Sequence, residues 1–153
     1  MPAQIIRPAA YAWIEDEGRV LLCRLSEAHH SGQWTLPGGG LEFGEDPAAG
    51  CRREVQEETG LEVELGRVLW VDSLCTEVRP ELAAREFPRL HGVPLPPGSA
   101  RMHSLRVVYR AHVTGGMLTP EADGSTDQVE WVAIGDVLRR PVVELVLAAL
   151  SAH

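Results

Sequence analysis

Residues 39–61 read GGLEFGEDPAAGCRREVQEETGL, and this stretch predicts a loop followed by a helix from Pro47 to Thr59. Asp46 suits the cap position, because its side-chain oxygen can accept an otherwise unpaired backbone amide at the helix start. Proline is tolerated at the first helical position, where its missing N–H costs nothing. Gly60 suits the left-handed residue that ends many helices.

Three glutamates share one face of this helix. Glu54, Glu57 and Glu58 are spaced three and four residues apart, so their side chains project together. Like charges at this spacing destabilise an isolated helix. The cluster is either a solvated acidic face or a site where a bound cation offsets the repulsion, and an all-oxygen site suits Mg²⁺ or Mn²⁺ rather than zinc. Arg53 stands beside the acids and can orient one of them through a charge-assisted hydrogen bond.

The whole stretch resembles the Nudix box, the signature of the Nudix hydrolase family. That pattern requires a glycine, five residues, a glutamate, seven residues, Arg-Glu-apolar, one residue, Glu-Glu, one residue and Gly-apolar. The chain matches it at every position, with Gly39, Glu45, Arg53, Glu54, Val55, Glu57, Glu58, Gly60 and Leu61. Such a spacing is far more specific than a lone glycine motif. Because the box covers 23 of 153 residues, it predicts chemistry better than it predicts substrate.

In that family, water attacks one phosphorus of a nucleoside diphosphate linked to another group, and the pyrophosphate bridge is cleaved. The resemblance implies that Glu54, Glu57 and Glu58 hold Mg²⁺, with Mn²⁺ as a substitute, and that Glu45 supports the site. Metal ions offset the charge of the diphosphate and align the reacting groups. The resemblance also implies that the backbone carbonyl of Gly38 joins the metal shell. The alternative is that the glycines before the box only shape a turn.

A general base must reach the attacking water. The resemblance makes Glu54 the first candidate, oriented by Arg53, with Glu57 as a catalytic metal ligand. Several Nudix enzymes take an extra acid from a later loop, which here is the polar stretch 117–127. No motif distinguishes its candidates as metal ligand or base, and these are Glu121, Asp123 and Asp127.

The motifs of family subgroups narrow the choice of substrate by elimination. VLWVDSLC stands where NADH-type members carry SQPWPFP, and LLCRLSEAHHSGQW lacks the arginine pattern of coenzyme A-type members. Pro80 lies nineteen residues beyond Leu61 rather than about fifteen as in ADP-ribose enzymes. What remains is a MutT-like nucleotide pyrophosphatase that converts a nucleoside triphosphate to monophosphate and pyrophosphate. The alternatives are an ADP-ribose or nucleotide-sugar pyrophosphatase and a non-catalytic nucleotide sensor, and the complete acid set favours an enzyme. No substrate-binding residue is assigned.

Composition narrows the class of protein. At 153 residues, the chain is expected to form a single domain over residues 1–153. Its net charge of −8, from 14 basic and 22 acidic residues, argues against nucleic-acid binding. The N-terminus carries no signal-peptide pattern, and the apolar run 142–150 is too short to span a membrane. Because family members often pair, the resemblance also raises the expectation of a homodimer.

Cysteine usage indicates the compartment. Cys23, Cys51 and Cys75 show neither zinc spacing nor a disulfide framework. Three reduced thiols are typical of a cytoplasmic protein.

Strand patterns surround the central helix. The order of elements predicts an α/β (α+β) protein, and the resemblance makes this a mixed β-sheet sandwiched between α-helices.

His29 and His30 are interpreted as exposed loop residues rather than substrate contacts. Trp131 is interpreted as a core residue rather than a stacking platform for a nucleotide base. The expected elements are a hairpin of strands 5–14 and 19–25, a short strand 34–36 broken by Pro37 and three glycines, strands ending near 71 and spanning 105–113 and 128–134, an irregular connection 79–102 that is a lid or plain surface, and a final helix 141–150.

Overall fold

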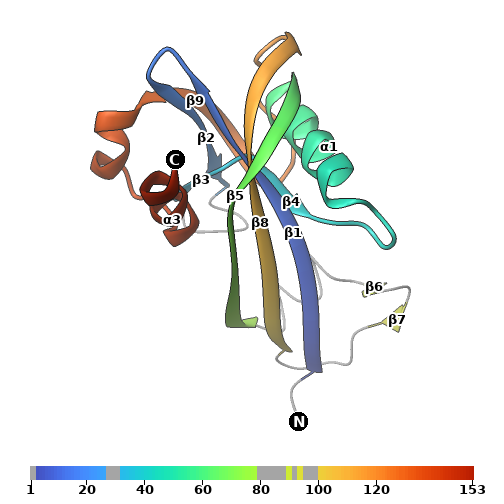
Figure 1. The fold of residues 1–153 in the computed structure, drawn as a ribbon. Helices are drawn as coiled ribbons and strands as arrows, with labels where there is room; N and C mark the ends of the chain where they lie inside the picture. The colour runs from blue at the N-terminus through green and yellow to red at the C-terminus, as the bar shows by residue number, and fades with distance from the viewer. Residues whose placement is uncertain (1–2, 27–31, 79–88, 91–92, 95–99) are drawn as a thin grey trace.

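A computed structural model of the chain describes residues 3–26, 32–78, 89–90, 93–94 and 100–153. It contains a mixed β-sheet with helices on both of its faces, as expected (Figure 1). The elements in chain order are β1 (Ala3–Asp16), β2 (Arg19–Leu25), β3 (Trp34–Thr35), β4 (Gly38–Gly40), α1 (Pro47–Thr59), β5 (Leu61–Val78), β6 (Arg89–Leu90), β7 (Val93–Pro94), β8 (Ala100–Gly116), β9 (Thr126–Ala133), the 3₁₀ helix η1 (Ile134–Arg139) and α3 (Glu144–Ala152).

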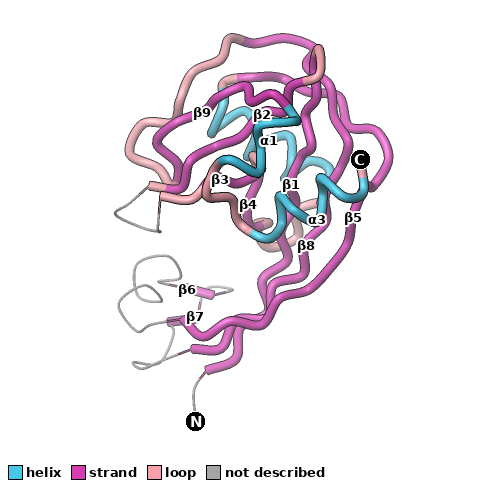
Figure 2. Tube along the Cα trace, turned by 90° about the vertical axis from the view of Figure 1, so that its left-hand side faces the viewer, coloured by secondary structure: helices cyan, strands magenta, loops and turns pink. Residues whose placement is uncertain are grey.

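Strand β1 lies at the centre of the sheet, whose order is β3-β2-β1-β8-β5. It runs parallel to β8 from Ala3 opposite Ala100 to Ile14 opposite Ala111, and antiparallel to β2 and β4. Strand β8 pairs in turn with β5 in antiparallel fashion, and Figure 2 shows β1, β8 and β5 running side by side over much of their length. Strand β9 pairs with β2 on the other side.

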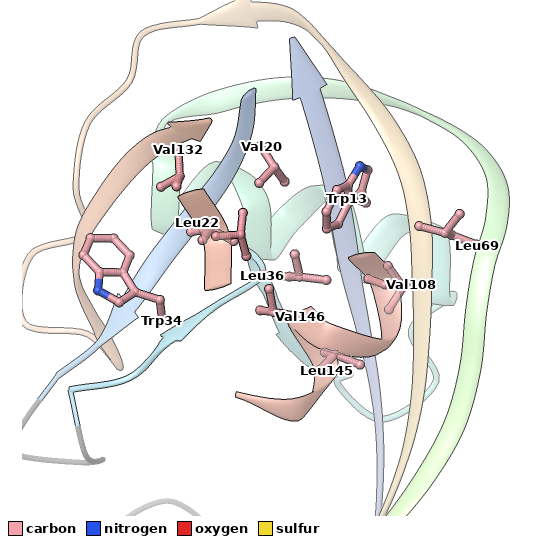
Figure 3. Packing of buried hydrophobic residues seen from close by; sticks show 12 residues of the cluster. Trp13, Val20, Leu22, Trp34, Leu36, Leu69, Val108, Val132, Leu145 and Val146 are labelled. Atoms are coloured by element: carbon pink, nitrogen blue, oxygen red, sulfur yellow. The ribbon is translucent and has the colours of Figure 1, made fainter. Parts of the chain in front are cut away.

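Both faces of β1 are buried, because successive side chains of a strand point to opposite faces. On one face, Ala10 and Ala12 pack against Cys51 and Val55 of α1. On the other face, Trp13 belongs to a second apolar cluster that includes residues of α3 (Figure 3). Burying one large apolar side chain contributes about 1.5–3 kcal/mol, so these two clusters hold the helices against the sheet. The small residues facing α1 let that helix approach the sheet closely.

Helix α1 has the predicted bounds and both predicted caps. Asp46 Oδ2 accepts hydrogen bonds from the amides of Ala48 and Ala49 at 3.1 and 3.2 Å. Gly60 is left-handed, with φ of 75°, and its N–H donates to the carbonyl of Gln56. The local sequence therefore determines where this helix begins and ends.

Strand β3 ends at Thr35, so the break predicted around Pro37 is present, but the three glycines that follow do more than shape a turn. They form β4, with Gly38 opposite Tyr11 and Gly40 opposite Ala9. Gly38 has φ of 144°, and a Cβ there would collide with the backbone of β1. The backbone hydrogen bonds supplied by β1 outweigh the weak strand preference of glycine, which a single sequence does not show.

The last helix begins at Glu144 rather than at Pro141. Residues 141–143 are extended beside β3, where the amide of Trp34 donates to the carbonyl of Pro141 at 2.8 Å and the amide of Val143 donates to that of Trp34 at 2.9 Å. The preceding η1 was not predicted. Both differences arise because backbone pairing with a distant segment overrides a helical apolar pattern.

Several other strands are longer than predicted. Strand β5 covers 61–78, and β8 begins at Ala100, inside the connection predicted to be irregular. Apart from β6 and β7, the rest of that connection lies outside the described residues, as do His29 and His30. Trp131 packs against the apolar cluster beneath α1, which confirms it as a core residue. No helix in the described part of the chain is long and apolar enough to cross a membrane.

Gly60→Ala should destabilise the fold by at least about 1–2 kcal/mol, because the left-handed conformation disfavours a side chain and a methyl group there would collide with the carbonyl of Met117. The control is Gly66→Ala in β5, where the nearest atom to the added methyl is the Arg110 carbonyl oxygen at 3.4 Å. Urea unfolding of both variants measures the difference. Equal losses in the two variants would contradict this account of the helix end.

Candidate active site

A cleft of about 830 Å³ lies beside β4 and the C-terminal half of helix α1. Glu54 and Glu58 of α1 and the glycines of β4 line one part of it, and residues 123–125 line another. Strands β1, β5 and β8 and the start of α3 complete the walls. The structure therefore places the predicted box acids at a concave surface that can hold a ligand.

Arg53 is the centre of the charged cluster. Its Nε and Nη2 donate to the two carboxylate oxygens of Glu45, each at 2.8 Å. Its Nη1 donates to Glu54 Oε1 at 2.9 Å and reaches Glu57 Oε2 at 3.3 Å. Its Nη2 also donates to the carbonyl of Gly40 at 3.3 Å. Arg53 thus orients three acids of the box rather than one, and ties α1 to the preceding loop and strand.

Glu45 is held in the loop before α1 by this two-point contact. The Arg53 hydrogen bonds lower the pKa of Glu45 to about 2, so this carboxylate stays charged. Gly50 makes room for it, since a Cβ on Gly50 would lie 2.7 Å from Glu45 Oε1. The absence of a side chain at Gly50 therefore leaves the space that the Glu45 carboxylate occupies.

Glu58 is the most buried acid of the cluster, at 3% exposure. Its Oε2 accepts a hydrogen bond from the backbone amide of Gly38 at 3.2 Å. Burial raises the pKa of Glu58 well above its usual range, and repulsion from Glu54 adds to the effect. The buried Cys23 thiol lies beside it, and burial followed by the charge of Glu58 raises the pKa of Cys23.

Glu54 and Glu57 differ in their exposure. The Glu54 side chain is 18% exposed, and burial raises its pKa although Arg53 opposes the shift. The Glu57 side chain is 51% exposed and is held by Arg53 Nη1 at 3.3 Å. These acids repel one another in a partly desolvated place, which is costly without a compensating cation.

The donor set fits a divalent cation. Carboxylate oxygens are the hard ligands that Mg²⁺ prefers, and Glu54 and Glu58 supply them at the cleft wall. A Cβ on Gly39 would lie 3.0 Å from Glu54 Oε2, so the glycine strand lets that carboxylate approach closely. Among the described residues, no three acidic, histidine or cysteine side chains already converge on one point as a metal site requires.

The three acids of the later loop occupy different surroundings. Glu121 lies near the box glutamates: burial raises its pKa, and repulsion from Glu57 contributes. Thr126 Oγ1 donates to Glu121 Oε2 at 3.3 Å. Gly124 packs directly against its carboxylate. Of the three candidates, Glu121 is thus brought to the cluster.

Asp127 and Asp123 have different surroundings from Glu121. Asp127 is bound by Arg24, with Nε–Oδ1 and Nη2–Oδ2 distances of 2.8 and 2.9 Å. Asp123 is exposed at the cleft, in a left-handed conformation with φ of 57°. Three acids within seven residues look alike in the sequence, because only the tertiary structure decides which one faces α1.

Sequence reasoning missed the arginines of the cleft. Arg7 of β1 and Arg106 of β8 both line it. Arg7 follows Ile5 and Ile6, and Arg106 precedes Val107 and Val108. An arginine next to apolar strand residues was the signal that could have revealed them. Arg106 is bonded to Asp72 at 2.7 and 2.8 Å and to Glu144 at 2.9 Å, which ties α3 to β8 and β5.

Comparison with known proteins identifies the family. The NUDIX domain profile matches residues 5–149, almost the whole chain. The chain belongs to the Nudix hydrolase family. This family consists of enzymes that open phosphoanhydride bonds and generally use a divalent metal, and the chain keeps the complete box of these hydrolases.

Curated relatives of this Nudix hydrolase match it around the box. Diphosphoinositol polyphosphate phosphohydrolase 2 of Rattus norvegicus is 44% identical over 57 residues, covering 37% of this chain and 31% of the relative. A MutT-like protein of Streptomyces ambofaciens is 43% identical over 58 residues, covering 38% and 36%. The matched region spans about a third of the length of these relatives.

Solved structures match over nearly the whole Nudix fold. A MutT NUDIX hydrolase from Burkholderia pseudomallei superposes with a TM-score of 0.72 at 26% identity, covering 96% of this chain and 97% of that one. An ADP-ribose pyrophosphatase from Streptococcus suis gives 0.62 at 22% identity, covering 95% and 90%, and shows the shared fold alone.

Asp127→Asn should lower stability at neutral pH by less than about 1 kcal/mol, as expected for a partly exposed ion pair. Arg24 lowers the pKa of Asp127 in the folded state, so its contribution is present above the ordinary value of 3.8 and is lost as pH falls through the lowered folded-state value. Urea unfolding at pH 7 and at acidic pH measures the difference, which should shrink on acidification. Asp123→Asn is the control and should change stability little. A difference that grows at low pH would contradict the pairing.

Proposed function

We propose that this protein is a Mg²⁺-dependent hydrolase of the pyrophosphate linkage in a nucleoside diphosphate linked to another group, with Mn²⁺ as a substitute. The preferred substrate is a (d)NTP, cleaved to a nucleoside monophosphate and pyrophosphate. One observation carries the proposal: Glu54 and buried Glu58 lie together at the cleft wall, next to Glu57, with a charge repulsion that a divalent cation would relieve.

Each acid has a role in this proposal. Glu54, Glu57 and Glu58 would hold Mg²⁺, which when bound offsets the charge of the diphosphate and aligns the reacting groups. Glu45 supports the site through Arg53, whose hydrogen bonds fix the rotamer of Glu54. The backbone carbonyl of Gly38 stays a proposed further ligand.

The general base is proposed to be Glu54, with Glu121 as the rival that the geometry favours within its loop. Burial raises the pKa of both carboxylates, which makes each a stronger base toward water. Arg53 bonds one oxygen of Glu54 at 2.9 Å and leaves the other for a water molecule. Asp127 is less suited to this role, because both of its oxygens are bonded to Arg24.

The small number of basic residues among the described lining of the cleft favours a substrate with a single phosphate chain. Among its described lining residues, the basic ones are Arg7 and Arg106, and Arg106 is already bonded to two carboxylates. An inositol ring carrying many phosphates, the kind of substrate named for the rat relative, would require more positive charge. An ADP-ribose or nucleotide-sugar substrate is the second candidate, and a non-catalytic sensor is disfavoured by the intact acid set.

The remaining expectations fit a small-molecule enzyme. The net charge of −8 supports a nucleotide substrate bound through metal rather than nucleic acid. Cys23 and Cys51 are buried and free, and Cys75 is exposed and free, which supports a reducing cytoplasmic location. Pairing into a homodimer stays a prediction.

A nucleotide panel with Mg²⁺ tests the proposal. Purified protein is incubated with each (d)NTP, ADP-ribose, nucleotide sugars and a diphosphoinositol polyphosphate, and products are separated by ion-exchange chromatography. Monophosphate and pyrophosphate from a triphosphate would support the preferred reaction. Cleavage of ADP-ribose alone would select the second candidate, and binding without cleavage of any compound would overturn the enzymatic proposal.

Glu57→Gln should lower kcat by at least about a hundredfold, since metal stabilisation of the transition state is worth several kcal/mol and about 1.4 kcal/mol corresponds to tenfold. Glu62→Gln, an exposed acid at the start of β5, is the control. Circular dichroism should show both variants folded. Near wild-type turnover of Glu57→Gln at saturating Mg²⁺ would refute the metal assignment.

Glu54→Gln and Glu121→Gln separate the two candidate bases. The loss of turnover in Glu54→Gln should persist as pH is raised, because the glutamine amide does not accept a proton from the attacking water. Glu121→Gln should cause a smaller loss. Steady-state kcat measured from pH 6 to 10 decides between them: rescue of Glu54→Gln at high pH, or a larger loss in Glu121→Gln, would move the base to another group.

A further inference from the structure

Strand β4 separates two charged groups in the cleft. A Cβ on Gly39 would lie 3.0 Å from Glu54 Oε2, whereas a Cβ on Gly40 would lie 3.1 Å from Arg7 Nε and 3.3 Å from Arg7 Nη2. Consecutive residues of a strand face opposite sides. The Glu54 carboxylate and the Arg7 guanidinium therefore lie on the two sides of the glycine strand, and both line the same cleft.

The sheet register positions Arg7 for this contact. Gly40 pairs with Ala9 of β1, and Arg7 precedes Ala9 by two residues. The side chains of Arg7 and Ala9 therefore project from the same face of β1. Arg7 also pairs with Ser104 of β8, which lines the cleft as well. The guanidinium is thus carried by the central strand of the sheet rather than by a loop.

We propose that Arg7 binds a phosphate group of the substrate, across β4 from the glutamates of the box. This inference rests on the proposed function and names a subsite within it. A guanidinium suits the role because its planar fork makes paired hydrogen bonds to phosphate oxygens. Glycines at β4 leave no side chain between the two halves of the site, so a phosphate chain can approach the backbone closely.

The charges of the cleft explain why such a residue is needed. Glu54, Glu58 and Asp123 all line it, and they repel a phosphate chain wherever metal does not intervene. Among the described residues that line the cleft, the basic ones are Arg7 and Arg106. Arg7 is the one whose guanidinium lies against β4, opposite Glu54.

The test uses imidodiphosphate, a diphosphate that resists hydrolysis, titrated with Mg²⁺ into the wild-type protein and variants by isothermal calorimetry. Arg7→Gln should weaken binding by about ten- to hundredfold, and Arg7→Lys should weaken it less. Arg101→Gln, which removes an exposed arginine of β8 outside the cleft, should stay within about twofold of wild type. Urea unfolding checks that each variant is folded.

The outcomes separate this inference from the proposed function. Equal binding by wild type and Arg7→Gln would overturn the role of Arg7 and leave the metal-dependent hydrolysis standing. No binding by wild type would also overturn the phosphate subsite, whereas the proposed hydrolysis is decided separately by the nucleotide panel. With a hydrolysed nucleotide, Arg7→Gln should raise KM at least about tenfold, while the Mg²⁺ concentration for half-activation stays unchanged. A shift in the Mg²⁺ requirement instead of KM would overturn the phosphate assignment.

Gly40→Ala offers a second, independent variant. The added methyl would press on the Arg7 guanidinium, so binding of imidodiphosphate should weaken in the wild-type background. The same substitution should have no further effect in an Arg7→Gln background, because the group it displaces is gone. An equal effect in both backgrounds would show that Gly40 acts through the backbone and would overturn the inference.

Discussion

The guanidinium of Arg53 connects the parts of the site to one another. It bonds both oxygens of Glu45 in the loop, one oxygen of Glu54 on the same helix, and the carbonyl of Gly40 on β4. These contacts join the loop, helix α1 and β4, and they add to the packing of α1 on the sheet and to the Gly38–Glu58 hydrogen bond. A single charged group therefore sets the orientation of carboxylates that repel one another, and the remaining geometry of the cleft depends on that orientation.

The acids of the box illustrate a conflict between stability and function. Glu58 is almost fully buried and accepts a hydrogen bond from Gly38, yet its charge is opposed by burial and by Glu54. A protein selected for stability alone would place an apolar residue there. Small residues on the other side of α1, such as Cys51, allow the helix to pack closely on β1 and offset part of this cost.

The glycine strand has two effects on the same site. By pairing with β1 it places Gly38 under the carboxylate of Glu58. By lacking side chains it admits Glu54 from one side and Arg7 from the other. The sheet register, rather than the box itself, thus brings a positive charge to the cleft.

The sequence alone determined helix α1 with both of its caps and the acids that line its face. These features depend on short-range hydrogen bonding and periodicity, which neighbouring residues encode. Tertiary structure decided the rest. The three glycines form a strand because they pair with β1. Helix α3 begins only at Glu144 because the preceding residues pair with β3. Glu121 lies near the box glutamates, whereas Asp127 is bonded to Arg24. Contacts between residues far apart in the chain carry no local signal, so one sequence does not reveal them.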